Sequence, residues 1–249
     1  MSLEFLVFAN LLLLARLWCL FKDNASEGLT WLNKTALELA ALLLLYRGGS
    51  VWIAAALTVA GLNLLGFWAE RHVRRKDFFR LLLEVAAIGL CSVWFSPRLG
   101  LVFRPGLAGL PGRLSGWTVL APWLELLASW RVQMILFGML VVANEANLVI
   151  RAVFDWLDLK PRMRSAEGGE IDVGEFNRGR VIGILERVLL YGFVLQAQYG
   201  AIGFILAAKA FTRFKALENR SFAEYVLIGT LLSACLALAT GTLLRHLLP

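Results

Sequence analysis

The chain has 249 residues, of which 59% are hydrophobic and only 17% are charged, and its formal net charge is +7. Soluble domains contain roughly 45–50% apolar and about 25% charged residues. These figures exclude a disordered chain, a collagen-like fibre and a disulfide-rich secreted module. They also argue against a soluble enzyme, because one small domain could not hide so much apolar surface. We therefore expect an integral membrane protein with an all-α fold.

Apolar stretches long enough to form transmembrane helices recur along the whole chain. Crossing the hydrocarbon takes roughly 20 residues of helix. In chain order, the expected spans are 3–21, 29–46, 50–69, 79–95, 132–150, 181–198, 200–214 and 222–246. The stretch at 200–214 is short, so a count of six or seven spans is the alternative to eight. On either count, residues 1–249 form a single polytopic transmembrane helix bundle.

Lys and Arg are distributed unevenly between the connecting segments. With the N-terminus outside, the inner segments hold 15 of the 25 basic residues and the outer segments hold six. Because basic residues accumulate in cytoplasmic loops, this bias predicts that both termini lie outside. All nine tryptophans fall at or beyond an expected span end, as in aromatic belts. The net charge then follows from topology and from attraction to anionic inner-leaflet lipid, and no nucleic-acid partner is implied.

Two long connecting segments are expected outside the bilayer. The first, 96–131, is an outer loop that is rich in Pro and Gly up to 122. Within it, Trp and Leu at spacings of three and four over 117–130 predict an interfacial amphipathic helix. The second, 160–180, is a polar cytoplasmic loop rich in Gly and in charges of both signs. It lacks the GxxxxGK[ST] pattern, so a solvated turn is favoured and a phosphate cradle is the alternative.

Sequence signatures of catalysis and of metal binding are scarce. The chain contains no HExxH, GxSxG or SxxK motif and only two histidines. Its three cysteines are widely spaced within apolar runs, which favours neither a disulfide framework nor a zinc site. Asp155 and Asp158 are similar to acidic pairs that hold Mg²⁺ in lipid transferases, but no further acids follow at matching spacing. The sequence therefore predicts no metal and no cofactor, and it favours a non-enzymatic role.

Ionisable and amide side chains inside apolar spans are costly and are therefore candidates for function. Arg16 is close enough to the inner interface to snorkel, and Lys34 has Glu38 as an i,i+4 partner. A polar patch near the inner end of the fifth span consists of Asn144, Glu145 and Asn147. Such a patch is interpreted either as hydrogen bonding between helices or as the lining of a polar cavity.

The last three expected spans carry most of the charges that fall inside the bilayer. Five residues at similar depth in the inner-leaflet half are Glu186, Arg187, Lys209, Arg213 and Glu224. Because the connections are short, the three helices should be neighbours and the charges should form one cluster. Thr230 and Ser233 are deeper polar candidates in the last span.

Two interpretations of this cluster stay open. One is a salt-bridged clamp that holds the three helices together. The other is a cytosol-facing site for an anionic group, such as a lipid phosphate, or a relay for ions or protons. Three bases against two acids leave a spare positive charge, which favours an anion.

Three motifs in this region resemble a known family. Residues 179–187 read GRVIGILER, residues 201–214 read AIGFILAAKAFTRF and residues 224–233 read EYVLIGTLLS. In this order and spacing they resemble the bacterial membrane proteins grouped as domain of unknown function 3307, over about 55 of the 249 residues. That family has no established activity, so the resemblance implies a bacterial inner-membrane protein. It also implies that the five clustered charges belong to one shared feature.

Three functions are compatible with these observations. The first is a small-solute or ion transporter or channel, which predicts a polar route open to both membrane faces. The second is a membrane scaffold or partner subunit, in a homo-oligomer or with another protein, which predicts a sealed and fully paired cluster. The third is a lipid-handling enzyme with an inner-leaflet anion site, which predicts a lateral opening.

Overall fold

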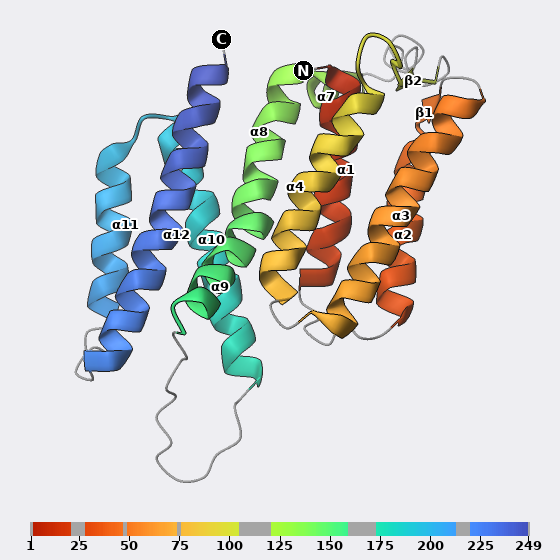
Figure 1. Ribbon diagram of the computed structural model, residues 1–249. Coiled ribbons are helices and arrows are strands. Elements are labelled where there is room, and N and C mark those ends of the chain that lie inside the picture. The colour runs from red at the N-terminus through yellow and green to blue at the C-terminus, as the bar shows by residue number, and fades with distance from the viewer. Residues whose placement is uncertain are drawn as a thin grey trace. The chain divides into compact units, whose positions relative to one another are not determined.

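The computed structural model describes residues 2–20, 28–46, 49–73, 76–104, 121–158, 173–212 and 220–248. Nearly all of this part of the chain is helical, which confirms the expected all-α class (Figure 1). Each of the eight apolar stretches contains a helix. The chain divides into two compact units, Met1–Leu140 and Val141–Pro249.

Six helices make up the described part of the first unit. They are α1 (Leu3–Leu20), α2 (Gly28–Leu42), α3 (Ser50–His72), α4 (Lys76–Trp94), α7 (Ala121–Ala128) and α8 (Trp130–Leu140). Helix α1 packs against α2 and α8, while α3 packs against α2 and α4. Apolar side chains from α1 to α4, including Phe8, Leu42, Val59 and Cys91, form the core of this unit.

The expected span at 29–46 is shorter as a helix than the sequence predicts. Helix α2 ends at Leu42, and a strand β1 (Leu45–Tyr46) pairs antiparallel with β2 (Val102–Phe103). The indole Nε1 of Trp52 donates to the carbonyl of Leu42 at 2.9 Å. The strand pairing and this indole supply partners for main-chain groups that a continued helix would have satisfied internally.

The outer loop expected at 96–131 is described only in part. Strand β2 lies within it, and α7 covers residues 121–128 of the stretch expected to form an amphipathic helix. Residues 105–120, including Trp117, lie outside the described residues. On α7, Trp123, Leu126 and Leu127 are exposed.

The second unit contains one short π-helical turn followed by four α-helices within its described residues. They are η1 (Val141–Glu145), α9 (Ala146–Trp156), α10 (Val173–Leu195), α11 (Tyr199–Thr212) and α12 (Arg220–Leu247). Helix α10 contacts α11, α12 and the π-helical turn, and α12 also contacts α9. A methyl group added at Gly241 would lie 2.7 Å from Val194, so this glycine lets α10 and α12 approach closely.

Helix α10 begins at Val173, whereas the sequence placed the start of its span at 181 and a polar loop over 160–180. That prediction was wrong for the last part of the loop, because Gly174 and Gly179 lie inside the helix. A glycine costs a helix only about 1 kcal/mol relative to alanine, which favourable packing farther along the helix can offset. Residues 159–172 lie outside the described residues.

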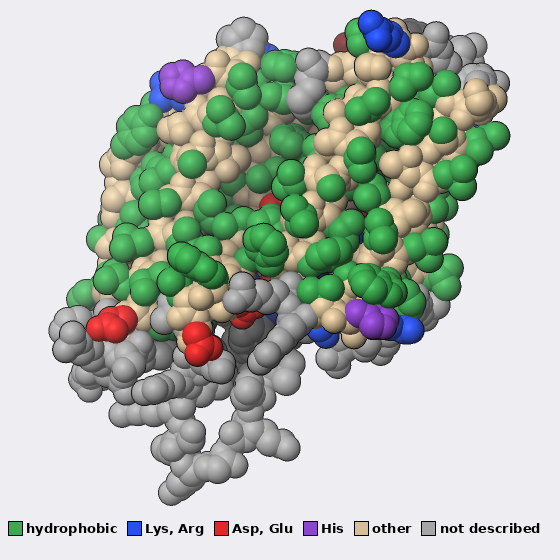
Figure 2. Space-filling model, in the orientation of Figure 1, with side chains coloured by type: hydrophobic (Ala, Val, Ile, Leu, Met, Phe, Trp, Pro, Cys, Tyr) green, Lys and Arg blue, Asp and Glu red, His purple; other side chains and the backbone are tan. Residues whose placement is uncertain are grey.

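Three helical segments are long and apolar enough to cross a membrane, namely Ser50–His72, Trp130–Trp156 and Ala223–Leu247. Their outward faces are apolar, as at Leu57 and Leu64 of α3, each 68% exposed. Figure 2 shows hydrophobic side chains over most of the visible face of each unit, with most visible charges near helix ends. Exposing this apolar surface to water would cost free energy, whereas lipid tails solvate it. These helices therefore indicate membrane insertion.

Candidate functional site

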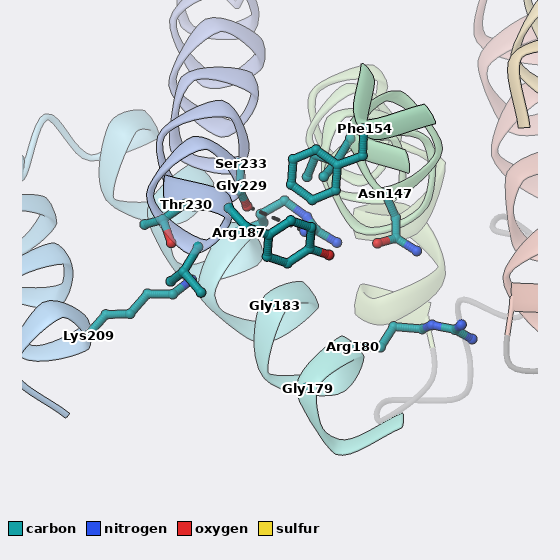
Figure 3. A pocket seen from close by; sticks show the side chains of 13 residues that line it. Asn147, Phe154, Gly179, Arg180, Gly183, Arg187, Lys209, Gly229, Thr230 and Ser233 are labelled. Carbon is teal, nitrogen blue, oxygen red and sulfur yellow. Dashed lines mark hydrogen bonds between the residues drawn. The ribbon is translucent and has the colours of Figure 1, made fainter. Parts of the chain in front are cut away.

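A pocket opens within the second unit, between α9, α10, α11 and α12 (Figure 3). Its cavity volume is about 160 Å³, which is room for several water molecules or one small anion. Three basic residues line it, Arg180, Arg187 and Lys209, and none of the described lining residues is Asp or Glu. The charged residues in the described lining are therefore all basic.

Arg187 is the most buried of these bases, with 3% of its surface exposed. Its Nε donates to the main-chain carbonyl of Val142 at 3.0 Å, and its Nη1 donates to Ser233 Oγ at 3.4 Å. Its Nη2 has no hydrogen-bond partner among the described residues. Two bonds therefore fix the planar guanidinium and leave one buried donor available.

The carbonyl that binds Arg187 belongs to the π-helical turn, Val141–Glu145. A π-turn shifts the main-chain bonding pattern from i−4 to i−5, which leaves a carbonyl near the turn in need of another donor. Arg187 supplies that donor from α10. The irregular turn and the buried cation thus hold each other in place.

Lys209 lines the same pocket from α11 and forms an ion pair with Glu186 of α10. Glu186 and Arg187 are adjacent, so their side chains leave the helix about 100° apart. One consequently contacts α11, and the other contacts the π-turn and α12. In Figure 3, Lys209 extends from α11 toward α12, while Arg187 lies between α12 and the helix that carries Asn147.

Small and polar side chains complete the pocket. Asn147 of α9 lines it, and its buried Nδ2 has no hydrogen-bond partner among the described residues. Thr230 and Ser233 contribute hydroxyl groups from α12. Gly183 lies one turn before Arg187, and a Cβ there would be 3.6 Å from Arg187 Nη1, an ordinary contact distance.

The other residues predicted from the sequence lie elsewhere. Asn144 and Glu145 are buried in the π-helical turn and do not line the pocket. Glu224 is exposed on α12 and is also absent from the lining. Arg213 lies outside the described residues.

Arg180 lines the pocket, although the sequence places it at the end of the polar loop 160–180 and outside the predicted charged cluster. It is 8% exposed and stands seven residues before Arg187, which is about two turns along the same helix face. The spacing 180, 183, 187 was a signal that could have found it. A span that begins at 181 excludes Arg180 from the bilayer, whereas α10 begins at Val173 and includes it.

The first unit contains polar contacts of a different kind. Lys34 of α2 forms the expected ion pair with Glu38 at 2.6 Å and donates to Asn63 Oδ1 of α3 at 2.7 Å. Asn63 in turn donates from Nδ2 to Glu38, which closes a triangle between the two helices. Arg16 does not simply snorkel, because it pairs with Glu84 of α4. Each of these two bases thus has a carboxylate partner.

Comparisons with protein-family models, with curated proteins and with solved structures find no match to this chain. Within the part of the chain that the structure describes, no group of three or more His, Cys, Asp or Glu could hold a metal ion.

Proposed function

We propose that this protein is a multi-pass protein of a bacterial inner membrane that moves a small solute or ion across the bilayer. In this proposal the helices outside the three long apolar segments also cross the membrane, which gives eight spans with both termini outside. The distribution of Lys and Arg supports this topology, and the resemblance to domain of unknown function 3307 supports the bacterial inner membrane. The pocket of the second unit is the proposed binding site.

One observation carries the transport proposal. Arg187 is a buried cation that lines an open pocket, and no carboxylate of the described residues forms an ion pair with it. Arg16 and Lys34 of the first unit, by contrast, pair with Glu84 and Glu38. A clamp needs such paired charges, whereas a binding site needs a donor held ready for a ligand.

A membrane scaffold is the second candidate, and the ion pair between Lys209 and Glu186 favours it. That pair ties α10 to α11, as a structural clamp would. In a scaffold the pocket would have no solute, and its lining would contribute only to stability. The two functions therefore differ in a flux measurement.

The test is solute flux through proteoliposomes that contain the full chain. Stopped-flow light scattering follows vesicle volume after mixing with hyperosmotic glycerol, potassium chloride or potassium phosphate, with valinomycin present to carry the compensating charge. We expect volume recovery at least several-fold faster than in protein-free liposomes for one of these solutes. Arg187→Gln should abolish the difference, because it removes the buried charge.

Arg245→Gln is the matched control, since it removes one positive charge from an exposed position of α12 that does not line the pocket. It should leave flux unchanged. Recovery no faster than in empty liposomes for every solute would overturn transport and leave the scaffold. Equal loss of flux in both variants would show that the pocket is not the route.

A further inference from the structure

The pocket of the second unit presents hydrogen-bond donors without matching acceptors. Two residues that line it, Arg187 and Asn147, each have a buried side-chain atom with no partner among the described residues. These atoms are Arg187 Nη2 and Asn147 Nδ2, and both are donors. Leaving a buried donor unsatisfied costs roughly 1–3 kcal/mol, and more for a charged group. A ligand that offers several acceptor atoms would remove both penalties together.

The charge of the pocket selects among such ligands. Arg180, Arg187 and Lys209 line it without any acidic lining residue among those described. Glu186 offsets the charge of Lys209, but it does not line the pocket. At close range a cation would be repelled by the buried guanidinium of Arg187, whereas an anion would be attracted.

The geometry further favours an oxyanion with several oxygens. The guanidinium of Arg187 is planar and is held by Val142 and Ser233, so its free donor has a fixed direction. The hydroxyl group of Thr230 lines the same pocket and can donate as well. Phosphate oxygens accept hydrogen bonds from Arg, amide and hydroxyl donors at once, and a volume of about 160 Å³ has room for one phosphate group.

From these observations we infer that the pocket binds a phosphate group, with Arg187 Nη2 and Asn147 Nδ2 as its central donors. The phosphate comes either from free inorganic phosphate or from the headgroup of an anionic lipid. This inference rests on the proposed function, because it assigns a chemical class to the ligand of the proposed binding site. Binding itself does not require that the ligand crosses the membrane.

Gly183 permits a sharp test, because a carboxylate can be placed there beside Arg187. In Gly183→Asp the Cβ of the new side chain lies 3.6 Å from Arg187 Nη1. The acid then stands four residues before the arginine on the same helix, which is the favourable order for an ion pair. It would satisfy the guanidinium internally and occupy the place of the anion. Gly183→Asn has nearly the same shape and no charge, so it is the matched control.

The experiment measures binding to the full chain in phosphatidylcholine nanodiscs by calorimetric titration with inorganic phosphate. A second arm uses nanodiscs containing phosphatidic acid or uncharged lipid, with the thermal midpoint of unfolding as readout. In the arm that shows binding, we expect Arg245→Gln, whose charge lies outside the pocket, to agree with wild type within about threefold. Gly183→Asn should weaken binding less than Gly183→Asp does, because it fills the same space without a charge. Gly183→Asp should weaken binding at least tenfold relative to wild type in the same arm. In phosphatidylcholine nanodiscs, its thermal midpoint of unfolding should be no lower than that of Gly183→Asn.

A response to inorganic phosphate identifies the free anion, and a response to phosphatidic acid alone identifies the lipid headgroup. Either one supports the inference if Gly183→Asp removes it. Equal binding by Gly183→Asp and Gly183→Asn would overturn the inference, and so would no response in both arms. Binding without flux would refute transport alone. If flux occurs but neither added phosphate nor Gly183→Asp changes it, the phosphate site is refuted and transport is not.

Discussion

Two arginines inside apolar helices illustrate how the same residue type takes different roles. Arg16 pairs with Glu84, and the two side chains are 12% and 10% exposed. Arg187 is more buried, and it donates to a carbonyl and a hydroxyl group instead of a carboxylate. The carboxylate of Glu84 neutralises the charge of Arg16, whereas both hydrogen-bond partners of Arg187 are uncharged. Sequence position alone did not distinguish them, because both were simply charged residues inside apolar stretches.

The pairing of Arg16 with Glu84 predicts a measurable coupling. Arg16→Met or Glu84→Met alone leaves one buried charge unpaired and should cost about 3–5 kcal/mol of stability. The double substitution removes both charges, so it should recover most of that loss. Thermal unfolding of the purified protein in nanodiscs measures all three variants.

Glu125→Met, at an exposed position of α7, serves as the control for removal of one charge and should change the midpoint little. Additive losses in the double variant would contradict the pairing. They would show that the two side chains contribute independently.

At the scale of single residues, the sequence identified several side chains that line the pocket, including Asn147, Thr230 and Lys209. It did so because polar groups are rare in apolar helices and stand out. It could not tell which of them meet. The direction of a side chain depends on the rotation of its helix about its own axis, and neighbouring helices set that rotation.

At the scale of the helix, α3 shows how this protein packs. Its buried residues are small or polar, such as Ala55, Asn63 and Gly66, while its large leucines face outward. This arrangement is typical of helices in lipid, where close approach and hydrogen bonds hold helices together better than bulky apolar contacts do. Gly66 is the tightest point among the described glycines of the unit, since a Cβ there would lie 2.6 Å from the Trp31 ring.

Gly66→Ala should therefore destabilise the first unit. The Trp31 ring cannot move away freely, because its Nε1 donates to Glu70 at 3.0 Å. Overpacking of this kind costs typically about 1–3 kcal/mol. A lower thermal midpoint in nanodiscs is the expected result.

Gly61→Ala is the matched substitution on the same helix, and nothing lies within 4 Å of its added methyl group. It should leave the midpoint unchanged or raise it slightly, because alanine favours helix over glycine by up to about 1 kcal/mol. Equal effects at both positions would show that the contact with Trp31 does not limit packing.

The π-helical turn is the element that the sequence could not predict. Val141–Glu145 reads VVANE and lies inside one continuous apolar stretch. Hydropathy is insensitive to a single extra residue in a turn. The turn is supported by the bond from Arg187 to Val142, a partner 45 residues away along the chain. Only packing against α10 brings that partner into reach.

At the scale of the whole molecule, the proposed topology predicts that the two ends of the chain lie on the same side of the membrane. After replacement of Cys19, Cys91 and Cys235 by alanine, Ser2→Cys and Leu248→Cys should each react with an impermeant maleimide in intact spheroplasts. Eight spans with both termini outside require this result, whereas labelling of neither end in intact spheroplasts would place both termini inside. Gel-shift labelling of each single-cysteine variant measures it.

Ser165→Cys serves as the inner-face reference and should react only after the cells are permeabilised. Labelling of one end alone would require an odd number of spans. A protein that crosses with only the three long apolar segments would give that pattern.

The sequence by itself determined that the chain is helical and apolar, and it placed most helices within a few residues of their observed bounds. This succeeded because hydropathy and helix length are local properties, and the bilayer sets both. The tertiary structure decided which charges meet: Lys209 with Glu186, and Arg187 with the carbonyl of Val142 and the hydroxyl of Ser233. Those contacts join residues far apart in the chain, and they depend on how each helix is rotated against its neighbours.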